Sequence, residues 1–213
     1  MDREHQENNK MLLSKQQQDA LSEIINIGFG RAASALSILV GQRVLLEAPK
    51  VDLYPISEMN RALDSLTGNE ITSVHQVFSG KLSGDAMLLM DSKSATALVD
   101  LLSGGEGKPH DMTEQDRESL RETGNILLNA FTGSFGNLLH VHITFTVPQL
   151  QHSSLSNMLT SLMINQRQLE FALIVHVNFR VVQGNVSGYV VIVMGIQSLE
   201  ALMDAMRVNG FID

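Results

Sequence analysis

The chain repeats itself at an interval of about 100 residues, and this repeat constrains the fold more than any other feature of the sequence. Residues 17–34, QQDALSEIINIGFGRAAS, and residues 115–136, QDRESLRETGNILLNAFTGSFG, both predict a long helix. Asn125 follows Asn26 by 99 positions (125 minus 26), and the same offset relates Pro148 to Pro49. Two copies of one unit predict a fold with an internal pseudo-twofold axis.

Each copy predicts the same order of elements: a long helix, a strand around the proline, a short helix, a two-strand hairpin and a closing helix. The short helices, hairpins and closing helices are predicted at 56–68 and 153–165, at 73–91 and 172–195, and at 92–104 and 196–208. Six strands covered by helices predict an α+β fold with a mixed or antiparallel six-stranded sheet.

A linker is predicted between the copies. Residues 104–112, GGEGKPHDM, are rich in Gly and carry Pro109. The chain therefore reads as a single domain, 1–213, made of repeats at about 14–104 and 113–208. The hairpins are related by an offset of 104 (Gly188 minus Gly84), which predicts an insertion of about five residues between Pro148 and Gly188.

Each long helix begins with a capping signal and carries a row of polar side chains. Ser14 and Thr113 are predicted N-caps, followed three residues later by Gln17 and Asp116, as in a capping box or a close variant. Each row falls within about 60 degrees of arc at 100 degrees per residue. The rows consist of Asp19, Glu23 and Asn26 in the first helix and of Glu118, Glu122 and Asn125 in the second.

The face opposite each row is apolar, so both helices are expected to bury it and to expose the row. The opposite faces carry Leu21, Gly28, Ala32, Ala35 and Leu39 in the first helix, and Leu120, Leu127, Phe131, Ser134 and Leu138 in the second. For one surface helix, a polar outer face is ordinary. Two copies that keep Glu-x-x-Asn, with a Pro 23 residues after each Asn (49 minus 26), favour a functional role.

Composition excludes several classes of chemistry and of partner. A formal net charge of −8 without dense Lys/Arg clusters disfavours nucleic acid. The absence of cysteine excludes disulfides, thiolate metal sites and Cys nucleophiles. No apolar run approaches about 18 residues and the first ten residues are polar, so we expect no membrane span, no secretory signal and a cytoplasmic location.

Other motifs give weaker signals. GFGRAA, residues 28–33, matches a dinucleotide fingerprint but lies inside a predicted helix, which favours close packing. His140 and His142 alternate on a predicted strand as candidate metal ligands, yet spacing identifies no third ligand, and ordinary strand histidines are the better interpretation. A Ser-His-acid triad stays open, although no Gly-x-Ser-x-Gly elbow is present.

The polar rows and prolines carry a resemblance to a known family. The pattern [Asp/Ser]-x3-Glu-x2-Asn-x22-Pro resembles the signature of the CheC, CheX and FliY phosphatases of bacterial chemotaxis. The residues that fit are Asp19, Glu23, Asn26 and Pro49, and again Glu122, Asn125 and Pro148. Glu118 departs from the pattern, because the family has Asp or Ser there. The resemblance covers essentially the whole chain, and two intact copies resemble CheC more than CheX, whereas FliY would add a flagellar-switch domain.

The resemblance implies hydrolysis of the aspartyl phosphate on a CheY-like receiver domain. The two asparagines would orient the attacking water, the glutamates at 23 and 122 would contact the receiver's active-site lysine, and the acids at 19 and 118 would assist docking. The two prolines would shape the strand that follows each helix. The chain would need no metal of its own, because the Mg²⁺ ion belongs to the receiver.

Two rival functions stay open. The first is a non-catalytic adaptor that binds and sequesters the receiver. The second is regulation through the deamidase CheD, which the family implies would dock on the short helix at 153–165. That segment, SSLSNMLTSLMIN, contains no acidic residue, which disfavours a CheD interaction.

Overall fold

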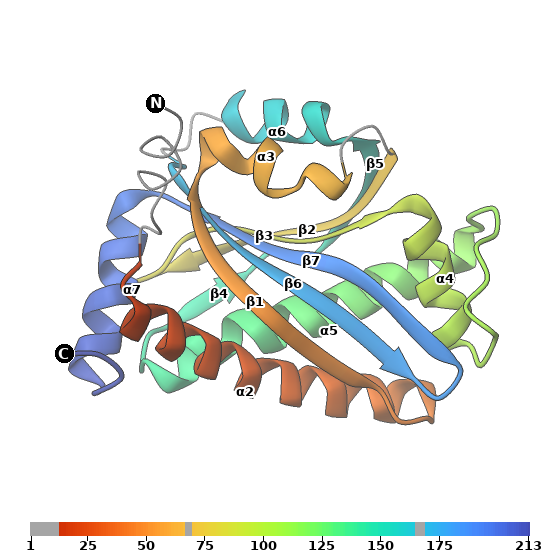
Figure 1. Ribbon diagram of the computed structural model, residues 1–213, viewed down its shortest axis with the longest axis horizontal. Coiled ribbons are helices and arrows are strands. Elements are labelled where there is room, and N and C mark those ends of the chain that lie inside the picture. Colours follow the sequence, from red (N-terminus) through yellow and green to blue (C-terminus); the bar gives the residue numbers. More distant parts are fainter. Residues whose placement is uncertain (1–12, 67–69, 165–168) are drawn as a thin grey trace, which may run out of the picture.

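The computed structural model describes residues 13–66, 70–164 and 169–213 (Figure 1). The helices are α2 (Lys15–Val40), α3 (Met59–Ala62), α4 (Ser92–Leu102), α5 (Glu114–Leu138), α6 (Leu155–Ile164) and α7 (Ile196–Val208), with the 3₁₀ turns η1 (Ile56–Glu58) and η2 (Asp64–Leu66). The strands are β1 (Leu45–Pro55), β2 (Glu70–Gly80), β3 (Gly84–Asp91), β4 (Ile143–Phe145), β5 (Gln149–Ser154), β6 (Phe171–Val181) and β7 (Gly184–Met194).

The strands form one sheet in which every pair is antiparallel. Its order is β1-β6-β7-β3-β2-β4, and β5 also pairs with β2. The order is symmetric about the central β7–β3 pair, because the hairpin of each half is flanked by the strand or strands that follow the long helix of the other half. The predicted α+β fold with pseudo-twofold duplication is confirmed, whereas the repeat boundaries stay a prediction.

The predicted number of six strands is wrong, because the strand expected around Pro148 is two strands. β4 ends at Phe145 and β5 begins at Gln149, and both pair with β2. In the first half β1 is continuous, but its pairing with β6 shifts register between Glu47 and Lys50, where Pro49 lies. Proline has no N–H to donate to a ladder, so each strand loses its regular pairing at its proline.

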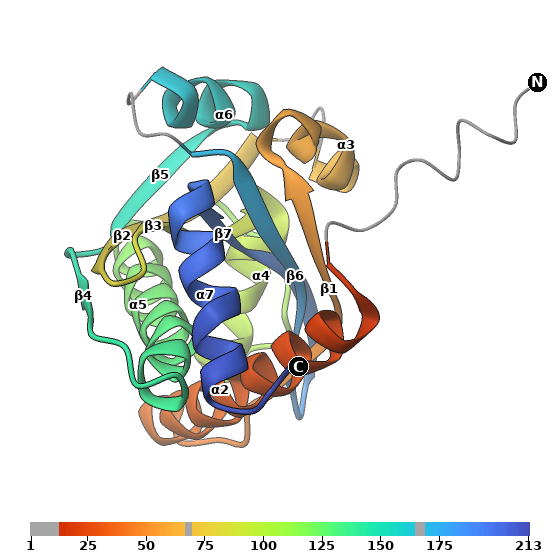
Figure 2. The ribbon, with the colours of Figure 1, turned by 90° about the vertical axis from the view of Figure 1, so that its left-hand side faces the viewer.

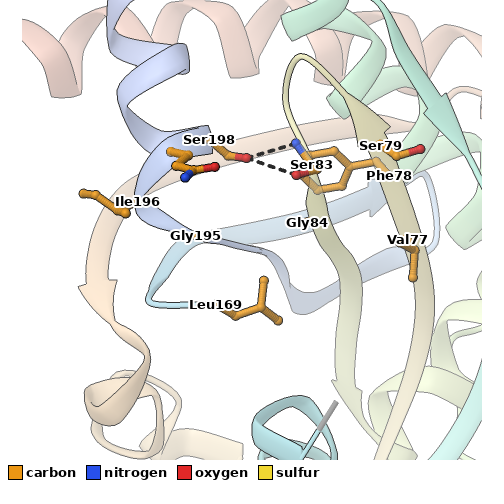
Figure 3. A pocket seen from close by; sticks show the side chains of 10 residues that line it. Val77, Phe78, Ser79, Ser83, Gly84, Leu169, Gly195, Ile196 and Ser198 are labelled. Carbon is orange, nitrogen blue, oxygen red and sulfur yellow. Dashed lines mark hydrogen bonds between the residues drawn. The ribbon is translucent and has the colours of Figure 1, made fainter. Parts of the chain in front are cut away.

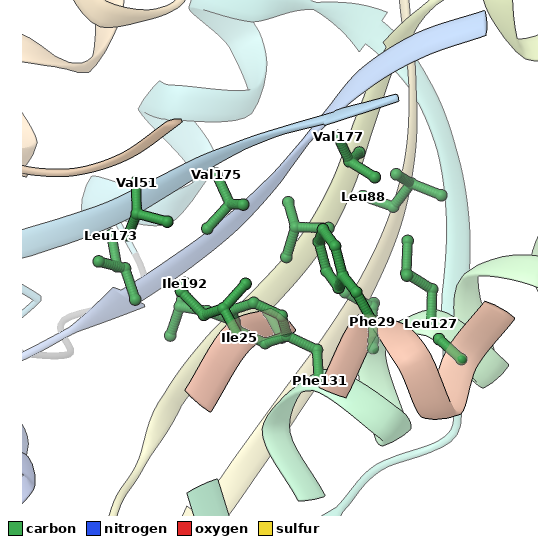
Figure 4. Packing of buried hydrophobic residues seen from close by; sticks show 14 of the residues in the cluster. Ile25, Phe29, Val51, Leu88, Leu127, Phe131, Leu173, Val175, Val177 and Ile192 are labelled. Atoms are coloured by element: carbon green, nitrogen blue, oxygen red, sulfur yellow. The ribbon is translucent and has the colours of Figure 1, made fainter. Parts of the chain in front are cut away.

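Helices cover both faces of the sheet (Figures 1 and 2). α2 and α5 pack side by side on one face, while α3 and α6 lie on the other. The larger core lies between the sheet and the α2–α5 pair, where Phe29 and Phe131 meet sheet residues such as Leu88 and Val175 (Figure 4). Each such side chain, fully buried, stabilises the fold by about 1.5–3 kcal/mol.

The two long helices approach closely where Gly28 faces α5. A Cβ atom at Gly28 would lie 2.9 Å from Ser134 Oγ and 3.2 Å from the Cα of Phe131. The rings of Phe29 and Phe131 lie 5.8 Å apart at the same crossing. The close-packing interpretation of GFGRAA is therefore confirmed at Gly28, whereas a Cβ at Gly30 would meet nothing within 4 Å.

Both predicted capping boxes are present. Ser14 Oγ accepts from Gln17 N at 3.2 Å, and Thr113 Oγ1 accepts from Asp116 N at 3.2 Å. These bonds satisfy amide groups that a helix start leaves without intrahelical partners. α2 ends at Gly41, whose φ of 68° is the left-handed conformation that glycine adopts without strain.

By length and composition alone, α2 is apolar enough to cross a membrane, with a mean hydropathy of 1.3 over an 18-residue window. Several of its apolar residues, including Leu21, Ile25 and Phe29, are buried in the larger core, whereas others near its end, such as Leu39, are exposed. Asp19 and Glu23 occupy its exposed face. Packing within the domain therefore accounts for part of the hydropathy of this helix.

Two residues expected on the buried face of α2 are exposed. Leu21, Gly28 and Ala32 are buried as predicted, but Ala35 is exposed and Leu39 keeps 55% of its surface accessible. On α5, the predicted Leu120, Leu127, Phe131 and Ser134 are all buried, and the predicted Leu138 has a side chain outside the described part of the structure.

Candidate functional site

The first polar row lies on the outer face of α2. Asp19, Glu23 and Asn26 are all exposed, while the flanking Ile24 and Ile25 are completely buried. Among the described residues, none hydrogen-bonds to the side chain of Asn26. The row therefore presents two carboxylates and a free amide from a helix that its buried face holds rigidly.

The second row lies on the outer face of α5. Glu118 and Glu122 are exposed, and Glu118 pairs with Arg121 one turn further along. Asn125 is half-buried and accepts a hydrogen bond at its Oδ1 from Asn129 Nδ2, at 2.8 Å. The two rows thus repeat the predicted spacing but differ in the surroundings of their asparagines.

A chain of hydrogen bonds fixes the orientation of the Asn125 amide. Gln76 Nε2 donates to the carbonyl of Thr146 at 2.8 Å and to Asn129 Oδ1 at 3.1 Å. A backbone carbonyl can only accept, so the nitrogen of Gln76 must point toward Thr146, and the amides of Asn129 and Asn125 follow in turn. The Asn125 NH₂ group is therefore left to donate outward.

Gln76 is a buried polar residue with one unsatisfied atom. It is 2% exposed, and among the described residues its Oε1 is the one buried side-chain N or O atom without a hydrogen-bond partner. Burying such an atom costs about 1–3 kcal/mol. The side-chain nitrogen of Gln76 links β2 to Asn129 beside the second row and to the backbone of Thr146.

Sequence reasoning missed Asn129 and Gln76, although Asn129 continues the second row. It lies four residues after Asn125, within the same arc of the helix. The matching position in the first copy is Gly30 (129 minus 99), so a comparison of the copies beyond the family pattern would have shown the difference. Gln76 gives no such signal, because its contact with Asn129 depends on tertiary structure.

The prolines of the family pattern lie in the strand interruptions described above. In the second half, the interrupted segment is anchored to β2: Thr146 N donates to Val77 O at 2.9 Å, and Val77 N donates to Thr146 Oγ1 at 3.0 Å. Gln76 then links the same segment to α5. The proline region and the asparagine row are therefore joined through one strand.

The start of α5 holds a titrating pair. His110 Nδ1 donates to Lys108 O at 3.2 Å, and His110 Nε2 lies 3.1 Å from Asp116 Oδ2. The hydrogen bond to the Lys108 carbonyl, followed by the one to Asp116, raises the pKa of His110. Burial alone would raise the pKa of Asp116, but hydrogen bonds from Thr113 and His110 outweigh it and hold this pKa below its usual value. The pair fixes the helix start that carries the second row.

The histidines considered as metal ligands are dispersed. His140 and His142 lie in the connection between α5 and β4, so their predicted strand placement is wrong; His140 adopts φ 52° just after the helix end. His152 contacts Thr72 and Glu70, and His176 stacks against Tyr189. Within the described residues, no group of three or more His, Asp or Glu side chains is arranged to hold a metal ion.

A separate hollow of about 320 Å³ lies between the β2–β3 turn and the start of α7 (Figure 3). Ser198 Oγ accepts from Ser83 N at 3.1 Å and lies 3.2 Å from Ser83 Oγ. The residues that line it include no acid, base or histidine to activate either serine. This hollow offers no catalytic arrangement that competes with the rows.

Comparisons with known proteins agree with the family resemblance. No protein-family model matches the chain. The flagellar motor switch phosphatase FliY of Bacillus subtilis (strain 168) is 28% identical over 141 residues, 65% of this chain and 36% of FliY. The CheY-P phosphatase CheC of the same organism is 26% identical over 143 residues, 65% of this chain and 67% of CheC. The chain thus matches little more than a third of the length of FliY.

The fold has a close counterpart among solved structures. The crystal structure of Thermotoga maritima FliY superimposes with a TM-score of 0.75 at 20% identity, covering 93% of this chain and 100% of that one. Identities of 28% and 26% do not separate FliY from CheC, so the expected greater similarity to CheC stays a prediction. In sequence the chain is similar to the phosphatases FliY and CheC, and it shares the fold of Thermotoga maritima FliY.

Proposed function

We propose that this protein removes the phosphoryl group from the aspartyl phosphate of a CheY-like receiver domain. The observation that carries the proposal is the pair of Glu-x-x-Asn rows on the outer faces of α2 and α5, exposed except at the half-buried Asn125. The relatives named as phosphatases support the same chemistry. An exposed catalytic helix suits a protein substrate, because it can enter the substrate's own active site.

The reaction needs few catalytic groups on the enzyme. An acyl phosphate is already reactive, so a positioned water and electrostatic support suffice. The water oxygen attacks phosphorus as the bond to the aspartyl oxygen breaks, which yields a free aspartate and inorganic phosphate. No covalent intermediate on this chain is needed, and the Mg²⁺ ion would arrive with the receiver.

Each row supplies three roles in this proposal. The amides of Asn26 and Asn125 orient the water, since an amide donates and accepts hydrogen bonds without a change of charge. Glu23 and Glu122 bind the receiver's active-site lysine, and the first acid of each row assists docking. A cytoplasmic location follows from a receiver substrate and is part of the proposal.

The test follows the loss of phosphoryl label from phosphorylated candidate receivers with catalytic amounts of protein. We expect wild type to accelerate the loss and the Asn26→Ala, Asn125→Ala double variant to slow it on the order of 10²-fold. Each single variant should keep part of the activity. Asn137→Ala, an exposed asparagine on α5 outside the row, is the matched control and should act like wild type.

The adaptor alternative makes a different prediction. A protein that only sequesters the receiver would bind its phosphorylated form without hastening decay. If the double variant dephosphorylates the receiver as fast as wild type does, the asparagines are not catalytic residues. Binding of CheD, tested by a direct pull-down, would be a separate activity on α6.

A further inference from the structure

A groove of about 660 Å³ lies beside the second polar row, where the ends of α2 and α4 meet the start of α5. Its apolar wall is formed by Leu39, Val40 and Leu102. Its polar wall includes Gln115, Glu118 and Glu122 from α5. The exposed Leu39, expected in the core, is therefore part of a recess that adjoins the row.

In the first half, the segment Asn209–Asp213 contacts the positions that correspond to the two ends of this groove. Leu139 corresponds to Val40 (139 minus 99), and Asn209 Nδ2 donates to its carbonyl at 3.3 Å. Gln16 corresponds to Gln115 (115 minus 99), and its Nε2 donates to Asp213 Oδ2 at 3.1 Å. Between these two anchors, Ile212 is 6% exposed and belongs to the larger core.

The counterpart segment in the second half follows another path. By the offset of 104 it comprises residues 105–109, which form part of the linker. Gly105 N donates to Asp100 O at 2.8 Å, and the amides of Gly107 and Lys108 donate to Asp100 Oδ2 at 2.8 and 3.0 Å. These bonds hold the linker against α4, and the groove stays open.

The charged side chains that line the groove are all acidic. Its lining includes the carboxylates of Glu118 and Glu122 and no basic side chain. Glu118 forms an ion pair with Arg121, which does not line the groove. Glu122 has no ion-pair partner among the described residues. An apolar wall facing a carboxylate fits an aliphatic side chain that is followed by a lysine or arginine.

We propose that this groove is a docking pocket for the receiver, which inserts one aliphatic side chain beside a basic residue. The inference rests on the proposed function for its partner, and it adds a docking contact beside the second row. At the pseudo-symmetric junction in the first half, the chain's own Ile212 is an aliphatic side chain buried in the larger core. The two rows would then differ in affinity for the receiver as well as in the setting of their asparagines.

The test uses two neighbouring residues of α2 in an Asn26→Ala background, so that only the second row acts. Leu39→Asp places a carboxylate in the groove; Ile38→Asp places one on a residue that is 80% exposed and does not line it. We expect Leu39→Asp to raise the Kd for a beryllium-fluoride-activated receiver, and the KM, about tenfold, with kcat unchanged. Ile38→Asp should change both less than twofold, and both variants should keep the parent's Tm.

The outcomes separate the groove from the proposed catalysis. Equal Kd values for the two variants would overturn the proposal that the receiver docks in the groove, whatever the dephosphorylation rate. A Kd that depends on Leu39 in a protein without phosphatase activity would support the groove and remove the catalytic proposal. Failure of wild type to bind any activated receiver would overturn both.

Discussion

The setting of each asparagine is the residue-scale difference between the two rows. Asn129 orients the Asn125 amide, whereas Gly30 leaves Asn26 without this partner. In an Asn26→Ala background, we expect Asn129→Ala to lower kcat about 2- to 10-fold with little change in KM, since one hydrogen bond is worth about 0.5–1.5 kcal/mol. Single-turnover dephosphorylation measures this directly.

The reverse change gives the control for that prediction. A side chain at Gly30 meets nothing within 4 Å, so Gly30→Asn fits on the surface of α2. In an Asn125→Ala background it should raise the kcat of the first row by a few fold. If neither substitution changes kcat, the hydrogen bond does not orient the amide for catalysis.

The His110–Asp116 pair predicts a small pH dependence of stability. The folded state raises the pKa of His110, so its contribution is present below the ordinary value of 6.5 and is lost as pH rises through the folded-state pKa. The Tm of wild type minus that of His110→Gln should therefore be larger at pH 5.5 than at pH 8. A constant difference would mean that protonated His110 does not stabilise the start of α5.

Among the elements, the α2–α5 crossing depends on one glycine. A Cβ at Gly28 would crowd Ser134 and the backbone of α5, so Gly28→Ala should destabilise the fold by about 1–2 kcal/mol. Gly30→Ala, in open space on the same helix, should stabilise it by about 0.5–1 kcal/mol. Urea unfolding of the two variants compares them; equal effects would show that the crossing tolerates a methyl group.

Local signals predicted most elements, and tertiary context decided the rest. The caps at Ser14 and Thr113, the hairpins and the closing helices follow from turn chemistry and periodicity, and the structure has them. The strand at Pro148 is split because proline removes a donor from the ladder. The exposure of Leu39 could not be predicted, because it depends on the path of the linker after α4.

The candidate site was predictable to a similar extent. Repetition identified both rows, and helical geometry placed them on exposed faces. The link from Asn125 through Asn129 to Gln76 joins a helix to a strand about 50 residues earlier, a contact that no local pattern encodes.

At the scale of the whole molecule, the two halves share one core. The β3–β7 pair and the α2–α5 pair both join residues from different halves. A protease site inserted between the exposed Lys108 and Pro109 should therefore give a cut chain whose halves still elute together in gel filtration. Separation of the halves after cleavage would contradict a single domain made of two repeats.

The α2–α5 crossing also has a consequence for the proposed docking on receivers. The two helices run in opposite directions, and each row lies in the N-terminal half of its helix (Figure 1). The two rows therefore lie near opposite ends of the helix pair. A chain that binds one receiver through each row would be bivalent. Where receivers are clustered, release from one row leaves the other attached, so avidity would keep the protein among them longer than either affinity alone.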